Sequence, residues 1–127
     1  MSKNINVAIV GVGRVGKTLL EKLLDHNGKG VTIVGVADKN PDAVGRKLAL
    51  EKGIKTYDSS EDIVNLGDKV DVIFELTGDS GARRDCRMAM VKSENIHTVI
   101  APETIAFLMW NIMTGGAEGM SGDAGGY

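Results

Sequence analysis

The chain has 127 residues, a length that suits one compact domain with its own hydrophobic core. Hydrophobic residues make up 43% and charged residues 25%, and a net charge of −2 provides no basic surface for nucleic acid. No apolar run approaches the roughly 20 residues that a membrane span needs. Because the start shows no secretory-signal pattern and the chain has one cysteine, we expect a cytoplasmic protein without an internal disulfide, and with no nucleic-acid or membrane partner.

Short apolar segments alternate with segments of helical pattern along the chain. We expect strands at residues 6–10, 31–37, 54–57, 70–76 and 98–100. We expect helices at residues 17–26, from Asn40 to just before Gly53, from Ser59 or Ser60 to Leu66, from Asp79 or Ser80 to about Lys92, and at 104–113. This alternation predicts a parallel sheet covered on both faces. The predicted fold class is α/β, a doubly wound, mainly parallel five-stranded sheet of Rossmann type with strand order 3-2-1-4-5.

The end of the chain differs in composition from the rest. Residues 115–127 contain six glycines, which favours a flexible tail over a packed element. We therefore expect the domain to occupy residues 1–114.

A glycine-rich loop follows the first predicted strand and opens the first predicted helix. It reads Gly11-Val12-Gly13-Arg14-Val15-Gly16, a G-x-G-x-x-G pattern in the context that dinucleotide binding requires. Gly11 permits the tight turn, Gly13 lets a pyrophosphate approach the backbone, and Gly16 lets the helix pack closely. The N–H groups of Arg14 and Val15 and the positive end of the helix dipole would hold the anion.

An acidic residue completes this pattern. Asp38 lies 22 residues after Gly16, at the end of the second predicted strand, where a carboxylate can accept hydrogen bonds from the adenosine ribose. The same charge would repel a 2′-phosphate, so NAD is the expected cofactor and NADP is disfavoured. Lys39, a predicted cofactor contact, and Arg46 lie close enough in sequence to soften that preference. A flavodoxin-like sheet with a glycine-rich turn and no nucleotide is the alternative.

Further candidates follow the fourth and fifth predicted strands, at the sheet edge where ligands bind in open α/β folds. We expect Thr77, Gly78 and Asp79 to line the nicotinamide half of the cofactor. For Glu103, which follows Ala101 and Pro102 after the fifth strand, a cofactor contact and an ordinary connecting loop both stay open. Glu75 is interpreted as a residue that caps or orients this loop. No residue is assigned a catalytic role or a metal.

Three other side chains belong to residue types that often react or bind metals: Cys86, His26 and His97. Cys86 lies among three arginines, which would stabilise a thiolate, but a cysteine packed on the sheet with the arginines facing solvent is the favoured interpretation. His26 and His97 have no partner at metal-ligand spacing, and we expect both in turns or at the surface.

The last predicted helix, residues 104–113, leaves almost no polar face. One side of an all-apolar helix packs on the sheet, and the remainder forms an exposed patch unless another molecule covers it. We therefore expect a homodimer or a partner protein to bind there.

Three segments resemble the NAD-binding domains of homoserine dehydrogenases, aspartate dehydrogenases and the glucose-fructose oxidoreductase and inositol dehydrogenase group. They are residues 6–16 (NVAIVGVGRVG), 34–40 (VGVADKN) and 71–78 (DVIFELTG). The resemblance covers residues 4–103 and implies a Rossmann fold that binds a dinucleotide. In those enzymes a larger C-terminal domain supplies most of the substrate site, and in many of them a lysine follows the fifth strand. This chain has neither feature, because its corresponding stretch is Ala101-Pro102-Glu103-Thr104.

A second resemblance rests on the run from Glu75 to Asp79 and the helix that contains residues 106–110. These are similar to small Rossmann domains upstream of bacterial sensor histidine kinases, which implies a nucleotide-responsive input domain. The leading hypothesis is a regulatory or sensory NAD(H)-binding domain with no catalysis of its own. The alternatives are the cofactor half of a split or truncated NAD(P)-dependent oxidoreductase, and an interaction module that binds no nucleotide.

Overall fold

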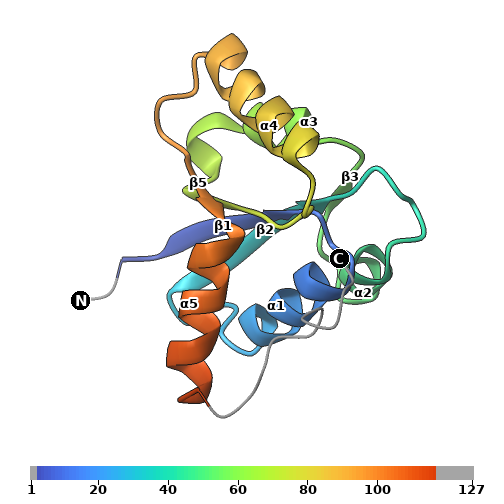
Figure 1. Ribbon diagram of the computed structural model, residues 1–127. Coiled ribbons are helices and arrows are strands. Elements are labelled where there is room, and N and C mark those ends of the chain that lie inside the picture. Colours follow the sequence, from blue (N-terminus) through green and yellow to red (C-terminus); the bar gives the residue numbers. More distant parts are fainter. Residues whose placement is uncertain (1–2, 117–127) are drawn as a thin grey trace.

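Parallel strands form the central sheet of the computed structural model, which describes residues 3–116 (Figure 1). They are β1 (Ile5–Val10), β2 (Val31–Ala37), β3 (Thr56–Tyr57), β4 (Val72–Glu75) and β5 (Val99–Pro102). Their order is β3-β2-β1-β4-β5, and every pair is parallel. The predicted α/β fold and strand order are confirmed. The order reverses between β1 and β4, which is where doubly wound sheets bind their ligands.

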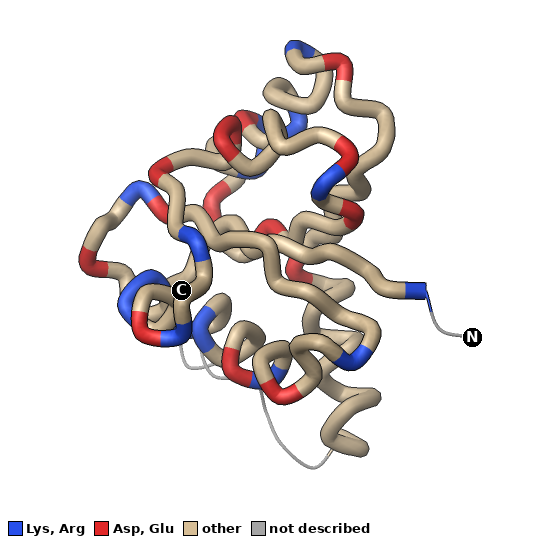
Figure 2. Tube along the Cα trace, turned by 180° about the vertical axis from the view of Figure 1, so that it is seen from behind, with Lys and Arg blue, Asp and Glu red and all other residues tan. Residues whose placement is uncertain are grey.

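Helices cover both faces of this sheet. On one face lie α1 (Arg14–Leu24), α2 (Val44–Glu51) and α5 (Glu103–Thr114). On the other lie α3 (Ser60–Val64) and α4 (Ser80–Ser93), with a short 3-10 helix, η1 (Gly67–Lys69), between α3 and β4. In Figure 2 the charged residues lie mainly on helices and loops, so the strands supply an apolar middle layer.

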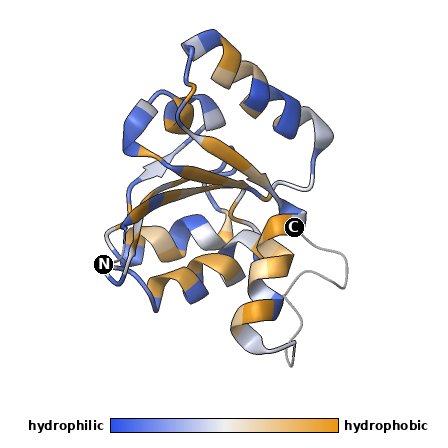
Figure 3. Cartoon of the chain, turned by 90° about the vertical axis from the view of Figure 1, so that its left-hand side faces the viewer, coloured by the Kyte–Doolittle hydropathy of each residue, from blue (hydrophilic) through white to orange (hydrophobic). Residues whose placement is uncertain are grey.

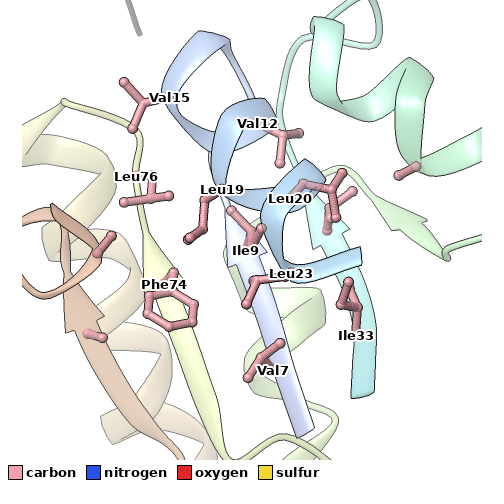
Figure 4. Packing of buried hydrophobic residues seen from close by; sticks show 14 of the residues in the cluster. Val7, Ile9, Val12, Val15, Leu19, Leu20, Leu23, Ile33, Phe74 and Leu76 are labelled. Atoms are coloured by element: carbon pink, nitrogen blue, oxygen red, sulfur yellow. The ribbon is translucent and has the colours of Figure 1, made fainter. Parts of the chain in front are cut away.

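The central strand β1 contributes to both hydrophobic cores because successive side chains of a strand point to opposite faces. Val7 and Ile9 belong to the core under α1, whereas Ala8 and Val10 belong to the core under α3 and α4. Figure 4 shows the α1 side, where three leucines meet the strand residues. These are Leu19, Leu20 and Leu23, all buried, and they form the helical stripe that the sequence predicts. Each fully buried leucine contributes about 1.5–3 kcal/mol of transfer free energy.

Two helices begin three or four residues away from the start that the sequence predicts. α1 begins at Arg14, three residues early, because the Lys17 N–H already bonds the Gly13 carbonyl at 2.8 Å. α2 begins only at Val44, because the Asn40 side chain accepts a 2.9 Å bond from the Asp42 N–H and holds a turn there. The sequence pattern of Asn, Pro and Asp is therefore the turn before the helix and not its first turn.

The third strand is shorter than predicted. Only Thr56 and Tyr57 pair with β2, and the preceding Ile54 N–H bonds the Ala49 carbonyl at 2.8 Å. Ile54 thus belongs to the hydrogen-bonded end of α2. Of the predicted tail, Gly115 ends α5 in the left-handed conformation with φ of 67°, and residues 117–127 lie outside the described part. No helix within residues 3–116 is long and apolar enough to cross a membrane.

His97 lies in an exposed turn, as expected, but it has a partner that sequence spacing did not reveal. Its Nε2 lies 2.7 Å from Oδ1 of Asp71, whose Oδ2 accepts a 2.8 Å bond from the Asn6 N–H of β1. The pKa of Asp71 is lowered from 3.8, first by the Asn6 N–H and then by the hydrogen bond to His97. The carboxylate therefore joins three neighbouring segments of the sheet at its amino-terminal edge.

The lowered pKa of Asp71 predicts how stability depends on pH. A folded-state pKa below the unfolded one stabilises the protein above the unfolded pKa, and this contribution is lost as the pH falls through the folded pKa. We expect Asp71→Asn to lower the unfolding free energy at about pH 5, with the difference from wild type vanishing towards about pH 2. Urea unfolding across this range measures it, with the exposed Asp68→Asn as control. A difference that does not depend on pH would contradict the expectation.

The last helix leaves part of its apolar surface uncovered, as the sequence predicts (Figure 3). Ala106 and Trp110 are buried against the sheet. Ile105, Leu108 and Ile112 are 41%, 53% and 72% exposed, and their spacing places them along one side of the helix. We call these three residues the α5 stripe.

The α5 stripe predicts self-association. We expect the wild type to sediment as a homodimer and the double variant Leu108→Lys, Ile112→Lys to sediment as a monomer, because two buried lysines would lose hydration. Leu50→Lys is the matched control, since Leu50 is a 63% exposed leucine on α2. A monomeric wild type in analytical ultracentrifugation would exclude the homodimer and leave a partner protein as the expected occupant.

Candidate functional site

A cleft of about 740 Å³ opens at the carboxyl edge of the sheet, where the strand order reverses. Its size lies within the range of small-molecule sites. The loops after β1, β2 and β4 form one side, and α3 with α4 forms the other. From the glycine loop it is lined by Gly11, Gly13 and Arg14, from the second strand by Asp38 and Lys39, and from the fourth by Leu76, Thr77 and Asp79. Most of the predicted site residues are therefore brought together at one cavity.

The floor of the cleft depends on two close backbone approaches. Gly11 has φ of +91°, and a Cβ on it would lie 2.7 Å from the Thr77 amide nitrogen. A Cβ on Gly16 would lie 2.1 Å from the Gly11 carbonyl oxygen. Neither position accepts a side chain, so the loops after β1 and β4 touch and α1 presses against them. Gly16 and Val15 are buried beside the cleft and do not line it.

The start of α1 is arranged to receive an anion. Gly13 is its N-cap, and no side chain caps this end and no acid lies in its first turn. The first N–H groups of a helix lack partners within the helix, and the dipole adds partial positive charge there. Gly13 and Arg14 line the cleft at this point. The donors present therefore fit a pyrophosphate group, whose oxygens accept hydrogen bonds from backbone N–H groups.

Asp38 holds the glycine loop to the end of β2. Its Oδ2 accepts a 2.9 Å bond from the Val12 N–H, and its Oδ1 accepts a 2.9 Å bond from the Asn40 N–H. A carboxylate has about four acceptor positions, so two remain for hydroxyl groups in the cleft. Lys39 is exposed and lines the cleft beside it.

The loop after β4 is held by a buried carboxylate. Glu75 is fully buried and accepts hydrogen bonds from both the N–H and the hydroxyl of Thr77. The guanidinium of Arg83 lies 3.5 Å from Glu75 Oε1 and 3.7 Å from Glu103 Oε1. Glu75 therefore orients the loop, as the sequence interpretation holds, while Arg83 joins the ends of β4 and β5 and does not simply face solvent.

The other predicted residues of this edge lie less directly at the cavity. Asp79 lines the cleft and also caps α4, because its side chain accepts a 3.1 Å bond from the Gly81 N–H. Gly78 is exposed with φ of 68° and makes the turn between the two lining residues beside it. Residues 101–103 do not line the cleft, and Glu103 is turned toward Arg83.

Cys86 packs on the sheet and is fully buried. Its burial, and secondarily the charge of Glu75, raises the pKa of the thiol to about 11. The alternative of a thiolate stabilised by neighbouring arginines is wrong, because burial raises the pKa of this thiol and so disfavours the thiolate. The favoured interpretation of a packed helix cysteine is confirmed.

The far wall of the cleft was missed by sequence reasoning. It consists of Asp58, Ser59, Ser60 and Glu61 before and within α3, and of Ala82, Asp85, Met88, Ala89 and Lys92 on α4. The α4 residues recur at helical spacing and therefore share one face. That spacing alone could have grouped them, but only the packing of α4 over the carboxyl edge of the sheet places that face at the cavity.

Comparisons with known proteins agree with this geometry. Residues 11–103 match the protein family described as the NAD-binding domain of homoserine dehydrogenase. An acetaldehyde dehydrogenase from Roseiflexus sp. (strain RS-1) is 33% identical over 75 residues, which are 59% of this chain and 24% of that protein.

Solved homoserine dehydrogenases share the fold. The enzyme from S. aureus at pH 7.5 superposes with a TM-score of 0.62 at 17% identity, over 80% of this chain and 26% of that one. The enzyme from Thiobacillus denitrificans superposes with a TM-score of 0.55 at 25% identity, over 91% of this chain and 27% of that one. The chain spans about a quarter of the length of each of these relatives.

The buried Glu75 network predicts a loss of stability on truncation. Glu75→Ala leaves the Thr77 N–H without its acceptor and removes one of the two carboxylates that face Arg83, and we expect the unfolding free energy to fall by about 2–4 kcal/mol. Chemical denaturation followed by circular dichroism measures this change. The control is Glu61→Ala, which removes an exposed acid on α3. Equal effects of the two substitutions would contradict a supporting role for Glu75.

Proposed function

The chain belongs to the family of homoserine dehydrogenase NAD-binding domains, and from this premise we propose that it serves as a regulatory or sensory domain that binds NAD(H) in the cleft. The glycine loop and the uncapped start of α1 would hold the pyrophosphate, through Gly13 and the N–H groups of Arg14 and Val15. Asp38 would accept hydrogen bonds from the adenosine ribose. Thr77 and Gly78 would line the nicotinamide half.

One observation carries the regulatory part of this proposal. The acidic side chains at the end of β4 and just after β4 and β5 already support the fold: Glu75 and Glu103 both face Arg83, and Asp79 caps α4. A general acid or base must instead reach the proton that it transfers. Bound nicotinamide supplies hydride chemistry, whereas the residues of this edge bind, orient and support loops. This edge of the sheet is better suited to a domain that senses the state of the nucleotide than to a domain that catalyses a reaction.

The comparisons favour a second candidate, the cofactor half of an NAD(P)-dependent oxidoreductase. The relatives named above are dehydrogenases, and the matched part is about a quarter of each. In this candidate the residues that bind and protonate a substrate come from another polypeptide or another part of the same protein. The names of the relatives point to homoserine or acetaldehyde as the first substrates to try.

Calorimetric titration tests the proposed cofactor site. We expect NAD or NADH to bind, and Asp38→Ala to weaken binding by about tenfold or more, because two lost charged hydrogen bonds exceed 1.4 kcal/mol. The control is Asp42→Ala, an acid that lines the same cleft but lies beyond the end of β2. Thermal melts show whether each variant is folded. An equal loss in both variants, or none in Asp38→Ala, would remove Asp38 from the ribose site.

The same titrations separate the two functions. A redox-responsive domain should bind one of NAD and NADH more tightly than the other, since regulation needs a difference in affinity between states. Steady NADH formation by the purified chain with homoserine, or with acetaldehyde, would instead overturn the regulatory proposal and support the dehydrogenase.

A further inference from the structure

Arg46, a base near the ribose end of the cleft, is held away from the cavity. One of its amino groups donates to the Asp38 carbonyl at 2.6 Å, and the other lies 2.8 Å from Asp58 Oδ1. Its side chain is only 14% exposed, whereas that of Asp58 is 83% exposed. Asp58 lines the cleft and Arg46 does not. The cleft therefore presents the carboxylate of this pair and conceals its guanidinium.

The position of Arg46 matters because its anchor is the backbone of the residue expected at the ribose. Asp38 offers its side chain to the cleft and its carbonyl to Arg46. The guanidinium is therefore bonded to the same residue whose carboxylate we expect at the adenosine ribose, the group that carries the 2′-phosphate in NADP. Arginine near the end of the second strand is the group that accommodates this phosphate in Rossmann domains, through paired N–H donors.

We propose that Asp58 determines nucleotide specificity by holding Arg46 out of the cleft, so that the site takes a dinucleotide with a free 2′-hydroxyl and rejects one with a 2′-phosphate. This inference rests on the proposed NAD(H) site. Two effects act together. The pair occupies the donors that a phosphate needs, and the carboxylates of Asp38 and Asp58 remain in the cleft, where they repel a dianion.

The ion pair that keeps Arg46 out of the cleft can be removed by one substitution, at Asp58. Asp58 is the exposed member of the pair, and Arg46 keeps its bond to the Asp38 carbonyl, so loss of Asp58 leaves the fold intact. The freed guanidinium keeps its attachment near the Asp38 carbonyl and gains the freedom to turn into the cavity. Lys39 is exposed beside it and adds a second positive charge. The expected result is a site that accepts the 2′-phosphate.

The test measures dissociation constants of NAD and NADP for the whole chain by calorimetry. We expect the ratio of the NADP constant to the NAD constant to fall at least about tenfold in Asp58→Ala, the gain of one charge-assisted contact. In the double variant Asp58→Ala, Arg46→Ala the ratio should return most of the way to that of wild type. The control is Asp62→Ala, which removes an acid of the same α3 region that does not line the cleft. Its ratio should change less than about threefold, since exposed charges are screened.

Each other outcome overturns the inference in a recognisable way. An unchanged ratio in Asp58→Ala, with normal NAD binding by wild type, shows that Asp58 does not set specificity and leaves the proposed function standing. A gain that persists in the double variant, or that Asp62→Ala reproduces, shows a general charge effect without Arg46. Absence of NAD binding by wild type removes the proposed function and the inference together.

Discussion

The close contact between the loops after β1 and β4 is the constraint on which the rest of this structure depends. Gly11 meets the Thr77 backbone and Gly16 meets the Gly11 carbonyl, and a Cβ at either glycine would collide with backbone atoms. This contact brings the start of α1 to the point where the strand order reverses. The helix start, the end of β2 and the loop after β4 can therefore share one cleft. A residue with a side chain at either glycine would push the loops after β1 and β4 or the start of α1 apart and change the shape of the cleft.

Two carboxylates then fix the loops that meet there. Asp38 binds the Val12 N–H of the glycine loop, and Glu75 binds the Thr77 N–H of the neighbouring loop. Each acid follows or ends a buried strand and accepts a charge-assisted hydrogen bond from a backbone N–H, at 2.9 Å for Asp38 and 3.2 Å for Glu75. At the glycine loop and the end of β2, the polar groups left toward the cleft therefore include the N–H groups at the start of α1 and the remaining acceptor positions of Asp38. These recognise phosphate and hydroxyl groups, which are the shared chemistry of dinucleotides.

The sequence predicts the features that depend on local residue patterns, and it misses those that depend on the packing of distant segments. The glycine loop, Asp38 and the strand order follow from spacing, because each glycine and each apolar strand has a local physical reason. The start of α2 was misplaced because an asparagine side chain competes with the helix for the backbone. The pairs Arg46–Asp58 and His97–Asp71 join residues 12 and 26 positions apart, so no short pattern contains them. Helical spacing does group the α4 residues of the cleft, but only the packing of α4 over the sheet edge places them there.

A site built from backbone donors does not by itself decide between regulation and catalysis. Binding needs complementarity to the nucleotide, whereas catalysis needs groups that act more strongly in the transition state. Here the acidic side chains at the ends of β4 and β5 already contact Thr77, Arg83 and the start of α4. Catalytic groups in this family of folds would then have to approach from outside these elements. The exposed α5 stripe lies on the helix that follows β5. We propose that a partner binds this stripe, and whether that partner carries substrate-binding groups would then separate a sensor from half of an enzyme.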